Sequence, residues 1–355
     1  MDWLDGIFDD ARAAALIGLA TGVILGLAAR RGRFCTLGAI EDGLYGGDWT
    51  RVRMWALALG VAILGTHGAA WAGMIDLGET LYARSAWNPV GSVVGGTLFG
   101  YGMAIAGNCG YGALARLGGG DLRSLVIVVV MGIAAYMTIA GPLAGLRVAL
   151  FPPEDAGPGT ITSYPALLER VISLPQAMTV VAIAMALLAW ALSDTGFRRS
   201  RPHVIWGAAV GIAVVLAWLG TGLVAEQSFD AVRIEGPSFT RPAGETLLFL
   251  MTSSGSGLSF GIGSVGGVIL GALIGSMSRG HFRWEACDDP GELGRQILGG
   301  ALMGVGGVLA LGCSIGQGLT AFSTLALSAP VVLAAIFAGT ALGLRHLIRG
   351  FALST

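Results

Sequence analysis

The most informative stretch of the sequence for the fold is "GGTLFGYGMAIAGNCGYGALARLGGG", residues 95–120. An apolar segment rich in glycine runs into Cys109, and Gly112 follows three residues later. Glycine weakens a helix in water, but inside a bilayer it allows helices to pack backbone to backbone. The stretch therefore indicates a closely packed membrane helix that stops at a thiol.

The same spacing occurs around three of the four cysteines. In each copy two glycines four residues apart precede the cysteine, and a third glycine follows it: Gly22, Gly26, Cys35 and Gly38; Gly96, Gly100, Cys109 and Gly112; Gly300, Gly304, Cys313 and Gly316. The last two copies also share Gly95 with Gly299 and Gly102 with Gly306. Because 59 of 355 residues are glycine, chance would produce this frame around a given cysteine about once in two hundred. Residues 266–283 form a degenerate fourth copy that lacks the cysteine. Internal repeats of this kind are typical of membrane transporters.

The composition indicates an all-α, polytopic membrane protein. Hydrophobic residues make up 54% of the chain and charged residues only 12%, and the mean hydropathy is +0.74, whereas a soluble domain carries about a quarter charged residues. All 21 basic residues are arginine, which excludes a lysine Schiff base and a P-loop lysine. A net charge of −1 gives no reason to expect nucleic acid as a partner.

The apolar runs predict about nine membrane spans. They lie near residues 13–30, 52–75, 89–107, 123–145, 174–193, 203–224, 246–277, 295–312 and 328–347. Arginine-rich breaks fall on one side of these spans, so the positive-inside rule predicts an N-terminus outside and a C-terminus in the cytoplasm. A linker rich in Pro and Gly, residues 151–173, divides a first half, residues 1–150, from a second half, residues 174–355.

Each cysteine is followed by a segment that is too short to span a membrane. These segments are "TLGAIEDG" at 36–43, "GYGALARLGGG" at 110–120 and "SIGQGLTAF" at 314–322. A broken helix at membrane depth is tolerated only where it lines a cavity, and the start of a new helix attracts an anion. The pattern therefore predicts short re-entrant helices and a path for an anion that passes three thiols.

These motifs resemble the YeeE/YedE family of bacterial sulphur-transport membrane proteins. The resemblance rests on "GRFCTLGA", "GYGMAIAGNCGYGALARLGGG" and "GGALMGVGGVLALGCSIGQGLT" and covers nearly the whole chain. It implies a thiosulfate importer of the bacterial inner membrane, with Cys35, Cys109 and Cys313 lining the route and a small cytoplasmic sulphur carrier of the TusA type as a partner. Some relatives are linked to selenium metabolism, so a selenium compound stays open as the solute.

The candidate residues of the transport path are the framed cysteines and their polar or glycine neighbours: Cys35, Cys109, Cys313, Gly38, Asn108, Gly110, Gly112, Ser314, Gly316 and Gln317. Asn108 and Gln317 have two readings, either as groups that orient the solute or as groups that satisfy backbone freed at the helix breaks. His67 is either a functional intramembrane histidine or one that is satisfied by a carbonyl. Cys287 lies outside the repeated frame and is interpreted as incidental.

Two other functional classes stay open at this point. A membrane thiol oxidoreductase would also use several cysteines, but such enzymes generally need cysteines paired in sequence and an electron acceptor. A structural subunit would explain the glycines but not the cysteine in the same frame three times. No enzyme activity and no cofactor are expected, and a metal site is rejected because no C-x-x-C or H-x-x-x-H spacing occurs.

Overall fold

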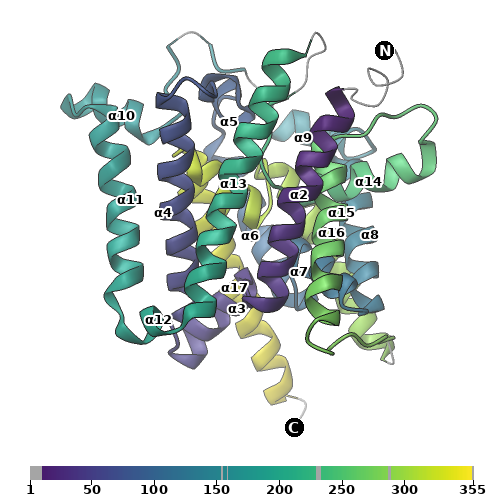
Figure 1. The fold of residues 1–355 in the computed structure, drawn as a ribbon. Coiled ribbons are helices and arrows are strands. Elements are labelled where there is room, and N and C mark those ends of the chain that lie inside the picture. The colour runs from purple at the N-terminus through teal and green to yellow at the C-terminus, as the bar shows by residue number, and fades with distance from the viewer. Residues whose placement is uncertain (1–9, 153–154, 158, 229–232, 287–288, 354–355) are drawn as a thin grey trace, which may run out of the picture.

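The protein is a bundle of long helices that stand side by side (Figure 1). The computed structural model describes residues 10–152, 155–157, 159–228, 233–286 and 289–353, and the side chains as far as residue 349. The chain enters at one end of the bundle, called the N-terminal face below, and leaves at the opposite C-terminal face (Figure 1). The long helices are α2 (Asp10–Arg31), α4 (Thr50–Trp71), α6 (Pro89–Ala106), α8 (Leu122–Ile139), α11 (Gln176–Ser193), α13 (Arg201–Gln227), α15 (Phe260–Met277), α16 (Pro290–Leu309) and α17 (Ser328–Leu353).

Eight helical segments of the described chain are long and apolar enough to cross a membrane, and α6 counts as one segment together with the short helix α7 (Gly110–Gly118). The all-α polytopic fold is therefore confirmed. The predicted number of nine spans is approximate, because α16 lies alongside α6 and α8 but carries Glu292 and Arg295 near its start. The predicted continuous span 246–277 is wrong. A shorter helix, α14 (Thr240–Thr252), ends first, and α15 begins anew at Phe260 with Ser259 as its N-cap.

Equivalent helices of two repeats, α6 and α16, pack against each other through glycine. A Cβ atom on Gly102 would lie 2.6 Å from the carbonyl oxygen of Gly299, and one on Gly306 would lie 2.6 Å from the carbonyl oxygen of Gly95. Position numbers rise along one helix as they fall along the other, so the pair is antiparallel. The glycines shared by these copies thus let the two backbones touch, and the two repeats have inverted topology.

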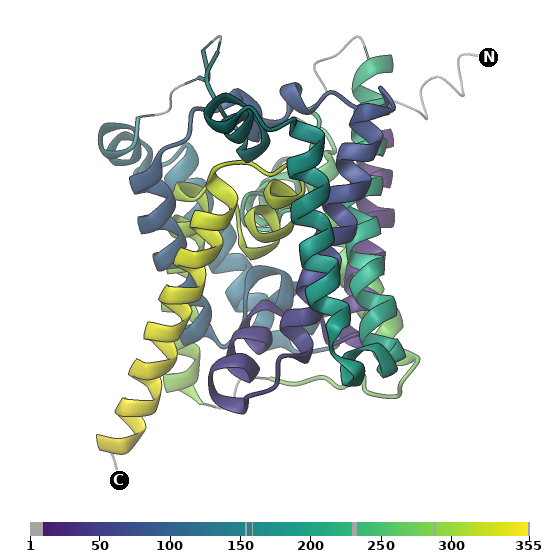
Figure 2. The ribbon, with the colours of Figure 1, turned by 90° about the vertical axis from the view of Figure 1, so that its left-hand side faces the viewer.

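The glycine pair of each frame packs on a long helix from elsewhere in the chain. Gly100 of α6 meets the backbone of α17 at Ile336, while Gly304 of α16 meets the backbone of α8 at Met131. Helices α6 and α8 belong to the Cys109 repeat, and α16 and α17 belong to the Cys313 repeat. The glycine-rich helix of each repeat therefore packs on the long helix that ends the other repeat. Figure 2 shows α17, in yellow, running the length of the bundle.

The first repeat packs in the same way on the degenerate copy. Gly22 of α2 and Gly267 of α15 approach so closely that a Cβ atom on Gly267 would lie 2.9 Å from the Cα atom of Gly22. Direct backbone contact of this kind maximises van der Waals packing where lipid offers no hydrophobic driving force.

Shorter elements fill the centre and both rims. In the centre are α3 (Thr36–Glu41), α7 and the π-helix η3 (Gly316–Ala321). At the rims are the π-helix η1 (Asp42–Gly46), η2 (Leu77–Glu79), α5 (Leu81–Arg84), α9 (Ala144–Leu150), α10 (Tyr164–Ile172) and α12 (Thr195–Arg199). The predicted linker 151–173 contains α10. Just before α10 begins, the chain pairs with the segment after η3: the amide of Leu327 donates to the carbonyl of Thr162 at 3.0 Å.

Candidate functional site

The three long helices that lead to the framed cysteines all end in the same way. Two residues before each cysteine the backbone is left-handed, with φ of 55° at Arg33, 69° at Gly107 and 55° at Leu311. A left-handed residue ends a helix and turns the chain away from its axis. Sequence reasoning missed this equivalence, because only one of the three positions is glycine.

Each cysteine then caps the short helix that follows it. The amide nitrogens of Gly38, Gly112 and Gly316 lie 3.5, 3.3 and 3.4 Å from the sulfur atoms of Cys35, Cys109 and Cys313. The sulfur is the acceptor in this bond, so the thiol hydrogen stays available for a different acceptor. The predicted short helices are thus present, and a thiol stands at the first turn of each.

The glycine after each cysteine also leaves room for a polar neighbour. A Cβ atom on Gly112 would lie 2.6 Å from Oδ1 of Asn108, and one on Gly316 would lie 2.6 Å from Oγ of Ser238. At Gly38 the corresponding neighbour is the guanidinium of Arg51. A larger residue at any of these positions would displace a polar group from beside the thiol.

The three motifs meet near the centre of the bundle. Thr36, which follows Cys35, donates its hydroxyl to Oγ of Ser314, which follows Cys313, at 3.1 Å. Cys109 lies next to the Ser314 hydroxyl and within electrostatic range of both other cysteines. Cys109 and Cys313 are buried and Cys35 is partly exposed, and all three are free thiols. The structure therefore brings the three framed cysteines together.

An extended segment, residues 233–239, lies over Cys313. The amide of Phe239 donates to the Cys313 sulfur at 3.3 Å, and the Ser238 hydroxyl lies 3.9 Å from the same atom. Thr320 of η3 holds the segment through a hydroxyl bond of 2.6 Å to the carbonyl of Pro237. Sequence reasoning assigned this region to a break between spans, and no local signal places it beside a cysteine.

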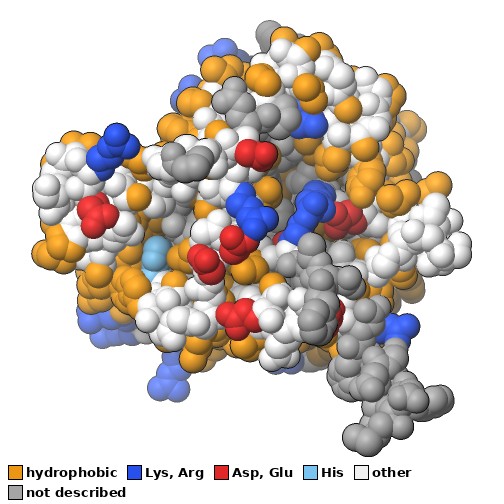
Figure 3. All heavy atoms as spheres, turned by 90° about the horizontal axis from the view of Figure 1, so that it is seen from above, with side chains coloured by type: hydrophobic (Ala, Val, Ile, Leu, Met, Phe, Trp, Pro, Cys, Tyr) orange, Lys and Arg blue, Asp and Glu red, His pale blue; other side chains and the backbone are white. Residues whose placement is uncertain are grey.

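The same segment lines a cavity of about 400 Å³, called the outer cavity below. Its described charged lining residues are Arg147, Arg233, Arg241, Glu235 and Glu245. Figure 3 shows arginine and acidic side chains gathered in the middle of the N-terminal face. Burial raises the pKa of Glu235, against the opposing effect of Arg241. The three arginines outnumber the two carboxylates, so the cavity favours an anion.

Asn108 and Gln317 take different roles in the structure. Gln317 donates to the carbonyl of Ala310 at 2.8 Å and accepts from the Ser328 hydroxyl at 3.3 Å, so it satisfies backbone freed at the helix break. The amide nitrogen of Asn108 is buried and has no hydrogen-bond partner among the described residues. Gly110 packs against the thioether of Met131.

Aromatic rings enclose the cysteine cluster. Phe34 stacks on Trp55 with 4.8 Å between ring centroids, and Tyr111 lies 5.5 Å from Phe239. The indole nitrogen of Trp55 is buried without a partner in the described part of the chain. Trp55 and Asn108 thus offer unpaired N–H donors close to the three motifs.

The C-terminal end of the site is polar. Arg51, which contacts Gly38, also pairs with Asp42 at 3.1 Å. Burial raises the pKa of Glu41, and the neighbouring Asp42 adds to the effect. Cys287 lies outside the described residues, and within them no three His, Cys, Asp or Glu side chains come together as metal ligands.

A polytopic helical bundle with inverted repeats and helices broken at its centre defines a membrane transport protein. The chain belongs to the sulphur transport family, whose pattern matches residues 31–342. It is 26% identical over 329 residues to the thiosulfate transporter TsuA of Escherichia coli strain K12, covering 86% of each chain. It is 28% identical over 324 residues to the thiosulfate transporter TsuA of Spirochaeta thermophila, covering 88% of this chain and 92% of that relative.

Proposed function

We propose that this protein imports thiosulfate, or a closely related sulfur anion, along a path that passes Cys313, Cys109 and Cys35. The observation that carries the proposal is the meeting of three thiol-capped helices beneath an arginine-lined cavity. Both relatives named above are thiosulfate transporters, and thiosulfate suits a site with arginines for its oxygens and thiols for its terminal sulfur.

We infer the order in which the anion passes the three cysteines from the burial of each cysteine and from the residues around it. Cys313 lies closest to the outer cavity, since Ser238 and Gly312 line that cavity and flank its sulfur. Cys109 is fully buried, and Cys35 is partly exposed among the charged groups of the C-terminal face. The anion would enter at the N-terminal face and leave past Cys35.

The thiols act as weak hydrogen-bond donors rather than as nucleophiles. Each sulfur accepts an amide N–H of its own short helix, which directs the S–H away from that helix. Three weak donors in series hold the anion loosely enough to release it, as conduction requires. The N–H groups of Trp55 and Asn108 are further donors suited to the anion's oxygens.

The orientation of the protein in the membrane is inferred from the distribution of its arginines. Arginines cluster toward the C-terminal face, at the end of α2, in α12 and at Arg345 and Arg349 of α17. We therefore assign that face to the cytoplasm of a bacterial inner membrane. This orientation puts the outer cavity in the periplasm. It also puts the exit beside Cys35 on the cytoplasmic side, where a TusA-like sulphur carrier would meet the imported anion.

Uptake of labelled thiosulfate tests the proposal directly. The purified chain in liposomes should equilibrate thiosulfate across the bilayer, while empty liposomes should not. Selenosulfate in the same assay addresses the selenium alternative, and electron transfer to a soluble quinone addresses the oxidoreductase alternative. The absence of thiosulfate flux in correctly inserted protein would remove the proposal.

A further inference from the structure

A second polar cavity shares the lining residue Tyr82 with the outer cavity. Its volume is about 410 Å³. Its polar lining includes His67, Asp76, Thr80, Gln176 and Thr324, and no arginine is among its described lining residues. It is therefore not a second copy of the anion site.

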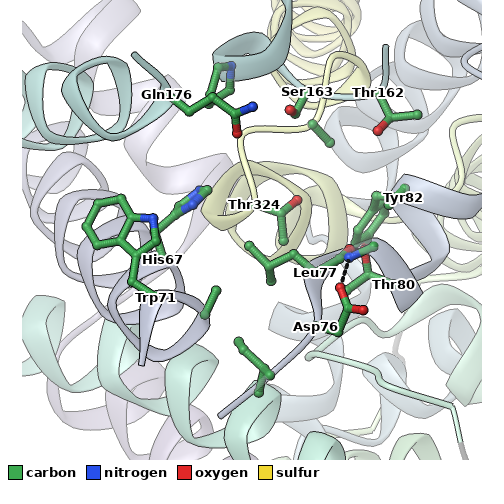
Figure 4. A pocket seen from close by; sticks show the side chains of 16 residues that line it. His67, Trp71, Asp76, Leu77, Thr80, Tyr82, Thr162, Ser163, Gln176 and Thr324 are labelled. Atoms are coloured by element: carbon green, nitrogen blue, oxygen red, sulfur yellow. Dashed lines mark hydrogen bonds between the residues drawn. The ribbon is translucent and has the colours of Figure 1, made fainter. Parts of the chain in front are cut away.

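His67 is the basic group of this cavity. It lies on α4, only 8% of its surface is exposed, and its Nε2 atom has no hydrogen-bond partner among the described residues. Figure 4 shows the imidazole extending from α4 toward the space between Gln176 and Thr324. An imidazole can bind and release a proton, and ionisable groups within membrane spans mark proton and ion pathways.

The other ionisable groups around this cavity favour a cation. Asp76 lines it and accepts the amide of Gly78 at 2.8 Å, and Tyr82 is a neutral phenol. Behind the lining, Glu169 accepts from the amide of Gln176 at 2.6 Å, and Glu79 pairs with Arg84. Asp76 is the one carboxylate among the described lining residues of this cavity, and its charge favours a cation there over an anion.

Residues close to the third cysteine motif also line this cavity. Thr324 and Ala326 line it, and they belong to the chain that follows η3. Tyr82 donates its hydroxyl to the carbonyl of Gly316 at 3.0 Å, at the start of η3 and three residues after Cys313. Tyr82 therefore connects the lining of this cavity to a π-helix, an element often found at functional sites.

We propose that His67 is the proton-binding site of an anion–proton symport, with the proton entering the His67 cavity while the anion enters the outer cavity. This inference rests on the proposed transport function. An anion moving into a cell that is negative inside moves uphill, so accumulation needs a coupled cation. The proton adds to a free imidazole nitrogen to give imidazolium, its release restores the neutral ring, and the anion is chemically unchanged.

The test measures thiosulfate accumulation in liposomes that contain the full chain, with and without an imposed inside-alkaline pH gradient. Wild type should accumulate thiosulfate above the equilibrium level only with the gradient, and a protonophore should abolish the excess. His67→Asn and His67→Gln should lose this accumulation but keep equilibrium uptake. His203→Asn is the matched control, since His203 lies on the first turn of α13 beside Ser200, and it should accumulate like wild type.

A second variant tests the same site while keeping the histidine. Asp76→Asn removes the carboxylate but keeps an oxygen for the Gly78 amide, so it should shift half-maximal accumulation to a more acidic external pH. Accumulation that ignores the pH gradient, or that survives in both His67 variants, would overturn the symport while leaving the transport proposal intact. If wild type shows no uptake even down a thiosulfate gradient, the transport proposal fails and the symport fails with it.

Discussion

The hydroxyl of Thr36 donates to Oγ of Ser314 at 3.1 Å, although 278 positions separate the two residues in the chain. Each follows a framed cysteine, so this bond joins the first turn of α3 to the third motif. Cys109 lies beside the same serine. The three repeats thus contribute residues to one common site.

Replacing Cys109 or Cys313 with Ala should abolish thiosulfate uptake, while Ser should retain part of it. Ala removes both the S–H donor and the cap, at a cost of about 1 kcal/mol in stability. Ser restores the cap to Gly112 or Gly316 and provides a stronger donor. Uptake normalised to inserted protein is the measurement. Cys287→Ser is the control and should transport normally. Full uptake by the Ala variants would refute the role of these thiols as hydrogen-bond donors to the anion.

Gly304→Leu should reduce the amount of folded protein in the membrane. The backbone of α8 lies against this glycine, since a Cβ atom there would be 2.5 Å from the carbonyl oxygen of Met131. Overpacking of this kind costs about 1–3 kcal/mol or more. Gly294→Leu on the same helix is the matched control, because nothing lies within 4 Å of its Cβ position. Equal yields of the two variants by fluorescence-detected size-exclusion chromatography would contradict the packing argument. Gly100→Leu is expected to behave like Gly304→Leu, because Gly100 meets α17 in the same way.

Leu311→Gly should raise the thermal unfolding midpoint in detergent. Leu311 holds a left-handed backbone, with φ of 55°, at the position that Gly107 occupies in the second repeat. That conformation costs a non-glycine residue about 1–2 kcal/mol, which exceeds the entropic cost of glycine of about 0.5–1 kcal/mol. Gly107→Ala should lower the midpoint for the converse reason. A lower midpoint for Leu311→Gly would show that its side-chain packing outweighs the backbone strain.

Glu235→Gln should lower the KM for thiosulfate at neutral pH. Burial raises the pKa of Glu235, so this carboxyl binds a proton at a higher pH than a free glutamate does. Protonation removes a negative charge from the outer cavity, and anion binding therefore strengthens as pH falls. The amide mimics the protonated state, so KM should fall about fivefold for a charge interaction of about 1 kcal/mol and vary less with pH. Glu226→Gln, at the exposed end of α13, should change neither value.

Trp55→Phe should raise the KM for thiosulfate while the protein stays folded. Phe keeps an aromatic ring against Phe34 but lacks the indole N–H, which has no partner in the described chain. Losing one hydrogen bond to a charged group costs about 1.5–3 kcal/mol, so affinity should fall about tenfold or more. Trp190→Phe on the peripheral helix α11 is the control. An unchanged KM for Trp55→Phe would place its N–H outside the path.

The apolar helices, their breaks at cysteine and the glycine frame can be predicted from the sequence alone, because they depend on residue type and local spacing. The frame around Cys109 predicts that a helix stops there, and the structure confirms a short capped helix after it. Local spacing also indicates that Gly95 is equivalent to Gly299 and Gly102 to Gly306.

Which helix surfaces pack against one another depends on long-range contacts and could not be predicted from local spacing. The left-handed backbone at Arg33 and Leu311 is imposed by packing, since neither residue favours that conformation on its own. Packing also placed residues 233–239 over Cys313 and made Tyr82 part of the lining of two cavities. The continuous span expected at 246–277 failed for a related reason. Apolar runs predict burial in the membrane but do not reveal that a segment between Thr252 and Phe260 leaves the helix to connect two separately packed helices.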